Sequence, residues 1–156
     1  YEELGDCSTG LVHFELYRDL IPRWRRSEVN WHIGNCSYLM AAELWAGIPQ
    51  EDRGMDSRDE QETLRLLETT INLREPRNRL AAAFFQKGEI LSLRGECDAA
   101  VDAFRRVVLE DPSGTSPLVG RARQRIDEIR FGSEESSRRP FWQREDPTEA
   151  TRRGCG

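Results

Sequence analysis

Two potential metal ligands, His32 and Cys36, lie four residues apart in a stretch that we expect to be helical. Side chains at this spacing share one face of a helix, and an imidazole with a thiolate can bind zinc. A zinc site needs three or four protein ligands, and the sequence shows no second pair at such a spacing. We therefore expect a packed or surface His32, a buried Cys36 and no metal ion.

Acidic side chains gather in a polar loop around Gly54. They are Glu51, Asp52, Asp56, Asp59 and Glu60. A calcium loop of the EF-hand kind needs acidic residues at its first, third and fifth positions, Gly at the sixth and Glu at the twelfth. That order is missing here, so we expect a solvated charged loop and no calcium site.

Catalytic motifs are missing from the sequence. It contains no P-loop, no Gly-x-Gly-x-x-Gly and no Gly-x-Ser-x-Gly nucleophile elbow. The remaining histidine, His13, stands beside Phe14, where we expect a structural role. These observations predict a protein that is not an enzyme and uses no cofactor.

A cluster of arginines surrounds Trp24. Its members are Arg18, Arg23, Arg25 and Arg26. Arginine with tryptophan can hold carboxylates, phosphates or stacked bases. The chain carries a net charge of −5, which disfavours nucleic acid as the partner. We expect a salt-bridged surface or a contact with an acidic partner, and the alternative is a regulatory helical domain that binds an anionic ligand here.

The four cysteines are Cys7, Cys36, Cys97 and Cys155. None are in Cys-x-x-Cys spacing, which argues against a zinc ribbon or a redox motif. Cys36 and Cys97 fall on helix faces where a small apolar residue packs, so free buried cysteine is the expectation for both. A Cys7–Cys36 disulfide is the alternative for an exported protein, and the sequence does not decide between them.

The bulk composition fits one helical domain. The chain has 156 residues, of which 37% are hydrophobic and 33% charged, as in helices with solvated outer faces. No run of about 18 apolar residues exists, so we expect no transmembrane helix. We also expect no signal peptide, and the start at Tyr1 rather than Met leaves open whether the chain is processed.

Turn and cap residues divide the chain into six helical lengths, and strand alternation is missing, which predicts an all-α fold. We expect Thr9, Ser27 and Ser116 as N-caps, and Gly47 and Pro112 as stops. The expected helices span residues 9–20, 27–46, 58–73, 77–94, 96–110 and 116–131.

The last part of the chain has a different composition. Residues 132–156 are polar, rich in Gly and Pro, and without periodicity. We therefore expect a helical domain over residues 1–131 and an extended tail over 132–156 that is ordered only on a partner. Phe141 and Trp142 are large aromatics in this tail, and we expect them to anchor a partner.

Small and aromatic residues recur at regular spacing between Ala81 and Pro112. We expect Gly88 and Ala100 to lie where two helix axes approach closely, with Phe104 filling the gap beyond. This stretch resembles the tetratricopeptide repeat, a helical hairpin of about 34 residues that stacks into a superhelix. The matching positions are Phe84, Gly88, Leu91, Gly95, Ala100, Phe104 and Pro112, and the departures are Lys87, Cys97 and Val107. The resemblance implies a short solenoid of antiparallel hairpins.

An earlier copy of the repeat begins at Ile33 and Gly34 and ends at Pro76, with Glu68 in place of an aromatic residue. Its inserted loop, residues 48–60, is similar to one in the tetratricopeptide lipoproteins of the bacterial outer-membrane β-barrel assembly machinery. The segment DPSGTSPLVGRARQRIDEI is similar to the ending of such envelope proteins. This narrower resemblance implies an envelope assembly factor and slightly favours the periplasm or cell envelope over the cytoplasm.

The resemblance also implies a binding groove, because the first helix of each tetratricopeptide hairpin lines the concave face. The implied groove residues are Trp31, Asn35 and Tyr38 from one hairpin, and Phe85, Glu89 and Ser92 from the next. The alternative is that Trp31 and Tyr38 pack against the first helix. Exposed aromatics among polar groups make a peptide-binding surface.

The function that we expect is therefore a non-catalytic protein–protein interaction scaffold, as a subunit or accessory of a larger complex. Its partners would be proteins, and it would contact a membrane only through a partner or an anchor outside this sequence.

Overall fold

A computed structural model describes residues 4–17, 20, 22–138 and 155 of the chain. These residues form six α-helices and two short 3-10 turns, and none of the described residues lies in a β-strand. The α-helices are α1 (Leu4–Tyr17), α2 (Arg26–Gly47), α3 (Arg58–Leu73), α4 (Arg77–Leu93), α5 (Cys97–Glu110) and α6 (Pro117–Arg138). The turns are η2 (Arg23–Arg25) and η3 (Gln50–Asp52). The all-α prediction is confirmed.

The three central helices begin and end within a residue of their predicted bounds. The start of α6 is also as predicted, because the Ser116 hydroxyl accepts the Leu118 N–H at 3.2 Å and Pro117 is the first helical residue. Gly47 is the last residue of α2, as expected. Local signals were sufficient for these helices.

The outer helices differ from the prediction. The first helix begins at Leu4, so Thr9 lies inside it and is not its cap. Ser27 is likewise inside α2, because η2 leads directly into a helix that begins at Arg26. At the other end, α6 runs past Gly132 to Arg138, so the first seven residues of the expected tail are helical.

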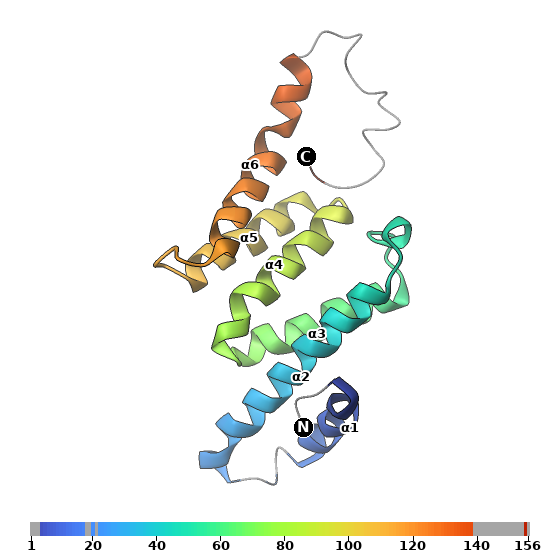
Figure 1. The fold of residues 1–156 in the computed structure, drawn as a ribbon, viewed down its shortest axis with the longest axis vertical. Coiled ribbons are helices and arrows are strands. Elements are labelled where there is room, and N and C mark those ends of the chain that lie inside the picture. Colours follow the sequence, from blue (N-terminus) through green and yellow to red (C-terminus); the bar gives the residue numbers. More distant parts are fainter. Residues whose placement is uncertain (1–3, 18–19, 21, 139–154, 156) are drawn as a thin grey trace.

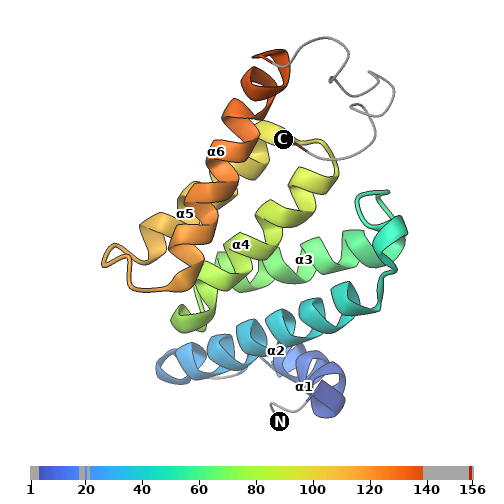
Figure 2. The ribbon, with the colours of Figure 1, turned by 45° about the horizontal axis from the view of Figure 1, so that its top comes forward.

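The helices pack in chain order as successive antiparallel pairs (Figures 1 and 2). The pairs α2 with α3 and α4 with α5 make the most extensive contacts, and α1 and α6 pack on the two ends. Helices two apart in the chain also touch, since α4 contacts both α2 and α6. This is repeat-like packing, in which every second helix lies on one side of the array.

The buried apolar residues form two clusters. One joins α1, α2 and α3 to one side of α4, and the other joins the opposite part of α4 to α5 and α6. Ile71 of α3 packs against both clusters. The chain therefore has a continuous core rather than two independent ones.

Gly88 permits the close approach of α4 and α5. A Cβ at this position would lie 2.8 Å from Cε1 and 2.9 Å from Cζ of Phe104, whose side chain is fully buried. Phe104 also packs edge-on against Phe85, with ring centroids 5.4 Å apart. Ala100 is fully buried as well. The expected small contact is confirmed, with the aromatic ring itself against the glycine.

Gly34 has the same role in the first hairpin. A Cβ there would lie 1.8 Å from the carbonyl oxygen of Glu75, directly before Pro76. The Thr70 hydroxyl donates to the Gly34 carbonyl at 2.8 Å, so α3 is tied to α2 at this point. Gly34 and the Glu75–Pro76 turn, assigned to one repeat from the sequence, are therefore in contact.

All four cysteines are in disulfides, so the prediction of free Cys36 and Cys97 was wrong. Cys7–Cys36 joins α1 to α2, and both side chains are fully buried. Cys97–Cys155 joins the start of α5 to the C-terminal end of the chain. The partner of Cys97 is 58 residues away in the sequence, a separation that no local pattern reveals.

Among the described residues, no helix is both long enough and apolar enough to cross a membrane.

Candidate functional site

A groove of about 640 Å³ runs along the side of the array formed by α2, α4 and α6. Alternate helices supply most of its lining, and the loop after α2 adds Gln50 and Arg53. The lining residues are Tyr38, Trp45, Gln50, Arg53, Ala82, Phe85, Gln86, Glu89, Leu93, Leu118 and Arg121. Five of these come from α4 at helical spacing, so one face of that helix forms the floor.

Aromatic rings with arginines stacked on them are the main feature of this groove. The Arg53 guanidinium carbon lies 4.7 Å from the centroid of the Trp45 ring, and that of Arg121 lies 4.8 Å from the Phe85 ring. At the edge, Arg79 lies 5.0 Å from the ring of Tyr38. Guanidinium–ring stacking at these distances stabilises both groups.

Arg53 also holds the backbone at the end of α2. Its side chain donates to the carbonyls of Trp45 at 3.0 Å and Ile48 at 3.1 Å. Trp45 lies in the last turn of α2, where intrahelical donors are missing, and Ile48 is the extended residue directly after the helix. The loop wall of the groove is thereby fixed to α2.

The single acidic lining residue, Glu89, is neutralised from α6. Its Oε1 accepts Nε of Arg125 at 3.0 Å, and Arg125 also donates to the buried Ser92 hydroxyl at 2.9 Å and to Glu128 at 2.5 Å. Partial burial lowers the pKa of Arg125, but its bonds to Glu128 and Glu89 outweigh this and raise that pKa. The hydrogen bond from Arg125 lowers the pKa of Glu128. This network fixes α6 on α4 and leaves the groove positive.

The structure brings three of the predicted groove residues together: Tyr38, Phe85 and Glu89. It does not place Trp31 and Asn35 there. Trp31 is half-buried with its ring edge-on to His32, centroids 5.2 Å apart, and Asn35 is buried in the packing of α2. Phe141 and Trp142 lie outside the described residues.

The predicted arginine cluster is on the surface at the start of α2. Arg23, Trp24 and Arg25 form η2 and are exposed, and the Arg25 guanidinium lies 5.3 Å from the Trp24 ring centroid. Arg26 is partly buried as the first residue of α2, and Arg18 lies outside the described residues.

The metal alternative at His32 and Cys36 meets an obstacle in the disulfide. Cys36 is bonded to Cys7 and has no thiolate to offer. In the described parts of the chain, no group of three or more His, Cys, Asp or Glu side chains is placed to hold a metal ion.

The acidic loop is more ordered than a solvated loop, because Glu60 is fully buried. Its carboxylate accepts the Gly54 N–H at 2.5 Å and the Asp56 N–H at 2.9 Å, while Ser57 caps α3 by accepting the Glu60 N–H at 3.2 Å. Arg94, the residue directly after α4, bridges to Asp56 at 2.9 Å. The signal that sequence reasoning missed is Ser-x-x-Glu at 57–60, the pattern of a capping box.

Trp45, Arg53, Leu118 and Arg121 are among the groove residues that were not predicted from the sequence. Trp45 was detectable, since it follows Tyr38 by seven residues and so lies on nearly the same face of α2. The others were not, because α6 and the loop reach the groove only through tertiary packing.

Comparisons with protein-family models, with curated proteins and with solved structures each gave no match, so the groove is interpreted from its own chemistry.

Proposed function

We propose that this chain is a non-catalytic protein–protein interaction scaffold, built of tetratricopeptide-like hairpins and acting as a subunit or accessory of a larger complex. The groove on α2, α4 and α6 carries the proposal. Its lining comes from three helices and includes aromatic and arginine side chains, the residue types enriched at binding hot spots.

The groove suits an extended segment of a partner protein. Its walls are fixed by the Arg53 bonds to the end of α2 and by the Arg125 network between α4 and α6. A preformed surface of this kind binds a peptide with little ordering cost on its own side. Since Glu89 is neutralised by Arg125 and Arg121 is exposed, a segment with an acidic residue fits best.

The tetratricopeptide likeness is supported by the packing of its marker residues. Gly88 lies against the ring of Phe104, and Gly34 lies against the turn before Pro76. The placement of α2, α4 and α6 along the groove fits first helices of successive hairpins, with α6 as the start of a third.

The test uses a matched pair of exposed arginines on α6. Arg121→Glu changes the groove, and Arg123→Glu makes the same change two residues along, outside the groove lining. Each variant and the unchanged chain are used to capture partners, which are quantified by mass spectrometry. A stoichiometric partner kept by Arg123→Glu and lost by Arg121→Glu supports the proposal. A partner that both variants keep would show that the binding surface lies outside the groove.

A second candidate, a bacterial envelope assembly factor, is favoured by the two disulfides. Disulfides persist in oxidising compartments such as the periplasm and are rare in the cytosol. Trapping thiols in intact cells with an alkylating reagent tests this. Four alkylated cysteines in the native protein would rule the candidate out, and a protected Cys7–Cys36 pair would support it.

A further inference from the structure

Large apolar side chains protrude from the end of the molecule where α1 leads into α2. The exposed fractions are 56% for Val12, 68% for Leu16, and 77% for both Leu20 and Trp24. Val12 and Leu16 are four residues apart in α1, so they share a face of that helix. The same end therefore presents four apolar groups to its surroundings.

The opposite face of α1 is already occupied. Cys7 and Leu11 are buried against α2, and the Cys7–Cys36 disulfide holds the helix in place. A helix with apolar residues on both faces is one that is covered on both sides. The outer face of α1 thus lacks a covering surface in the described part of the chain.

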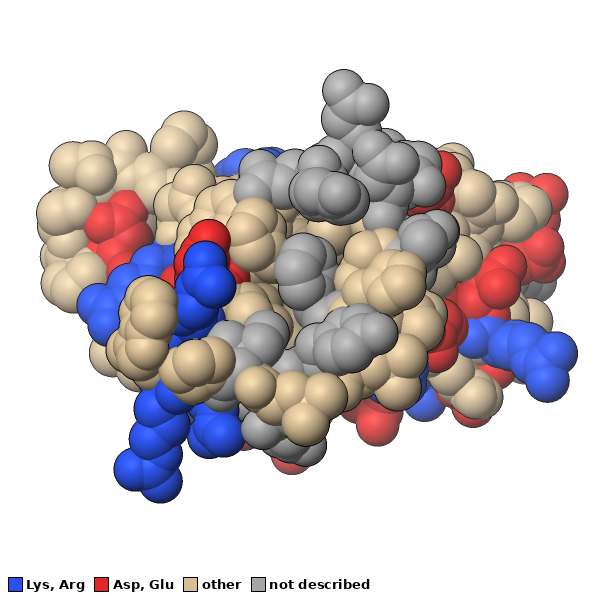
Figure 3. Space-filling view, turned by 90° about the horizontal axis from the view of Figure 1, so that it is seen from below, with Lys and Arg blue, Asp and Glu red and all other residues tan. Residues whose placement is uncertain are grey.

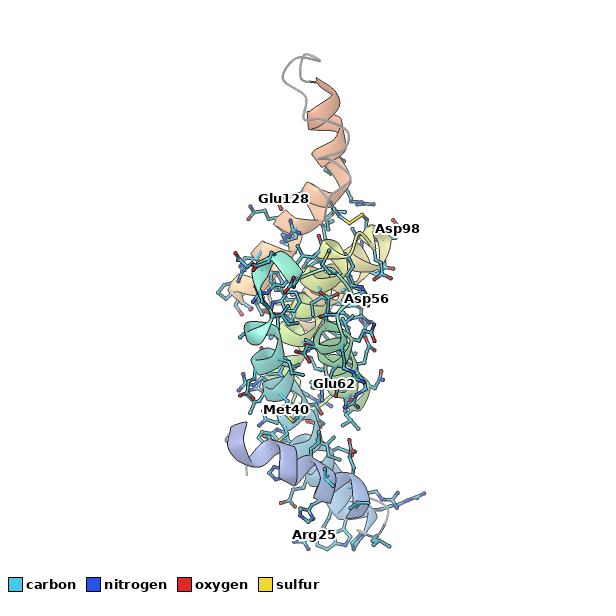
Figure 4. The ribbon with its side chains drawn as sticks, turned by 90° about the vertical axis from the view of Figure 1, so that its right-hand side faces the viewer. Arg25, Met40, Asp56, Glu62, Asp98 and Glu128 are labelled. Carbon is cyan, nitrogen blue, oxygen red and sulfur yellow. A yellow bond between two sulfur atoms is a disulfide. The ribbon has the colours of Figure 1, made fainter. Side chains whose placement is uncertain are left out.

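Positive charge lies next to these apolar side chains. Residues 22–28 contain Arg23, Arg25 and Arg26 against one acid, Glu28, in a chain whose net charge is −5. Arg23 and Arg25 are exposed, and Glu15 is an exposed acid on α1. Figure 3 shows Lys and Arg side chains gathered on the left of this end, the side where α2 begins. Figure 4 places Arg25 at the end of the molecule farthest from Asp98 and Glu128.

We propose that this end, formed by Val12, Leu16, Leu20, Trp24, Arg23 and Arg25, docks on the surface of a lipid bilayer that contains anionic lipids. Tryptophan and leucine insert at the level of the head groups, where Trp is enriched, and nearby arginines are attracted to anionic lipids. The four apolar side chains are each more than half exposed, and a fluid bilayer needs no matching pocket to receive them.

A second copy of the chain fits this end less well. A two-fold symmetric contact places the same patch against itself, and this would bring Arg23 and Arg25 of both copies together. Like charges at an interface cost several kcal/mol, so the arginines disfavour such a dimer. An anionic surface instead satisfies both the arginines and the apolar groups.

Docking by this end leaves the groove accessible. The groove begins on α2 at Tyr38, twelve residues after Arg26, which corresponds to about 18 Å along the helix axis. The inference therefore concerns a separate surface, and its failure would not affect the proposed function.

The experiment measures co-sedimentation of the intact, oxidised chain with vesicles of phosphatidylcholine alone or with one third phosphatidylglycerol. We expect binding to the anionic vesicles only, and a loss of binding at high salt. Arg23→Gln with Arg25→Gln removes two near-surface charges and should weaken binding about thirtyfold. The matched control, Arg58→Gln with Arg123→Gln, removes two exposed arginines elsewhere and should bind as the unchanged chain does.

A second variant pair tests insertion. Leu20→Ser with Trp24→Ser should abolish sedimentation, whereas Leu109→Ser, at a 64% exposed leucine of α5, should not. All seven substituted positions are exposed, so thermal melts should stay unchanged and exclude unfolding as a cause. Equal binding to both vesicle types, or none, would overturn the proposal. So would a dimer in light scattering that the Leu20/Trp24 variant abolishes, or tighter binding to polyglutamate than to anionic vesicles, which would point to an acidic protein.

Discussion

Replacing Gly88 by alanine tests the contact that holds the second hairpin together. The added Cβ would lie 2.8–2.9 Å from three atoms of the Phe104 ring, and that ring is fully buried. Phe85 and other core residues surround it, so the ring has little room to move away. The substitution therefore forces overpacking of the core.

Two opposed effects set the size of the change. Overpacking of a core lowers the free energy of unfolding by about 1–3 kcal/mol. Because the Phe104 ring is enclosed, we expect a value in the upper part of this range, about 2–3 kcal/mol. Alanine is better than glycine in a helix interior by about 1 kcal/mol. The clash is the larger effect, so the free energy of unfolding should fall by about 1–2 kcal/mol.

Gly120→Ala is the matched control, because Gly120 is an exposed residue of α6 with nothing within 4 Å of an added Cβ. Only the helix propensity changes there, so the free energy of unfolding of that variant should rise by about 0.5–1 kcal/mol. Urea unfolding followed by circular dichroism gives both values. If Gly88→Ala is stabilised like Gly120→Ala, the ring does not confine this position and the proposed packing of α4 on α5 is wrong. Adding Phe104→Leu should relieve part of the clash, giving a double variant more stable than additivity predicts.

Three further substitutions test other contacts by the same unfolding measurement. Gly34→Ala places a Cβ 1.8 Å from the Glu75 carbonyl oxygen, so the free energy of unfolding should fall by more than about 3 kcal/mol, or the chain should not fold. A stability near that of the unchanged chain would contradict the close approach. Glu60→Ala leaves two backbone N–H donors without their buried acceptor, so the free energy of unfolding should fall by about 3 kcal/mol. Residues 50–57 should also become more sensitive to proteolysis. An unchanged cleavage rate would show that the loop does not depend on this carboxylate. Joint replacement of Cys7 and Cys36 by alanine opens a covalent loop spanning 29 residues, so the free energy of unfolding should fall by about 3–4 kcal/mol. Equal stability of the variant and the oxidised chain would refute a structural role for the bond.

The sequence was sufficient for helices whose ends are set by local chemistry. The α3, α4 and α5 boundaries follow from Pro76, Gly95 and Pro112, which act within a turn of where they stand. It failed where glycine does not end a helix. Gly132 lies inside α6, although glycine in a helix interior costs about 1 kcal/mol relative to alanine.

The groove was predictable only in part, for a geometric reason. Spacing along α2 shows that Trp31, Tyr38 and Trp45 share a face, but it does not show where α4 and α6 cross that face. The crossing lies toward the C-terminal half of α2, so Tyr38 and Trp45 line the groove and Trp31 does not. The sequence offered the Cys7–Cys36 disulfide only as an alternative for the same reason, since this bond depends on how α1 packs across α2.

The helix α2 links the two proposed surfaces, and its fastening indicates that they act separately. It begins at the arginine-rich end, is held in the middle by Cys36 and Gly34, and lines the groove beyond Tyr38. A helix fixed at its centre by a disulfide and a buried hydrogen bond transmits little movement from one end to the other. Arg121→Glu should therefore leave vesicle binding unchanged, and the Leu20/Trp24 variant should leave partner capture unchanged. A variant that affects both measurements would mean that α2 moves as a lever and that docking at one end controls binding at the other.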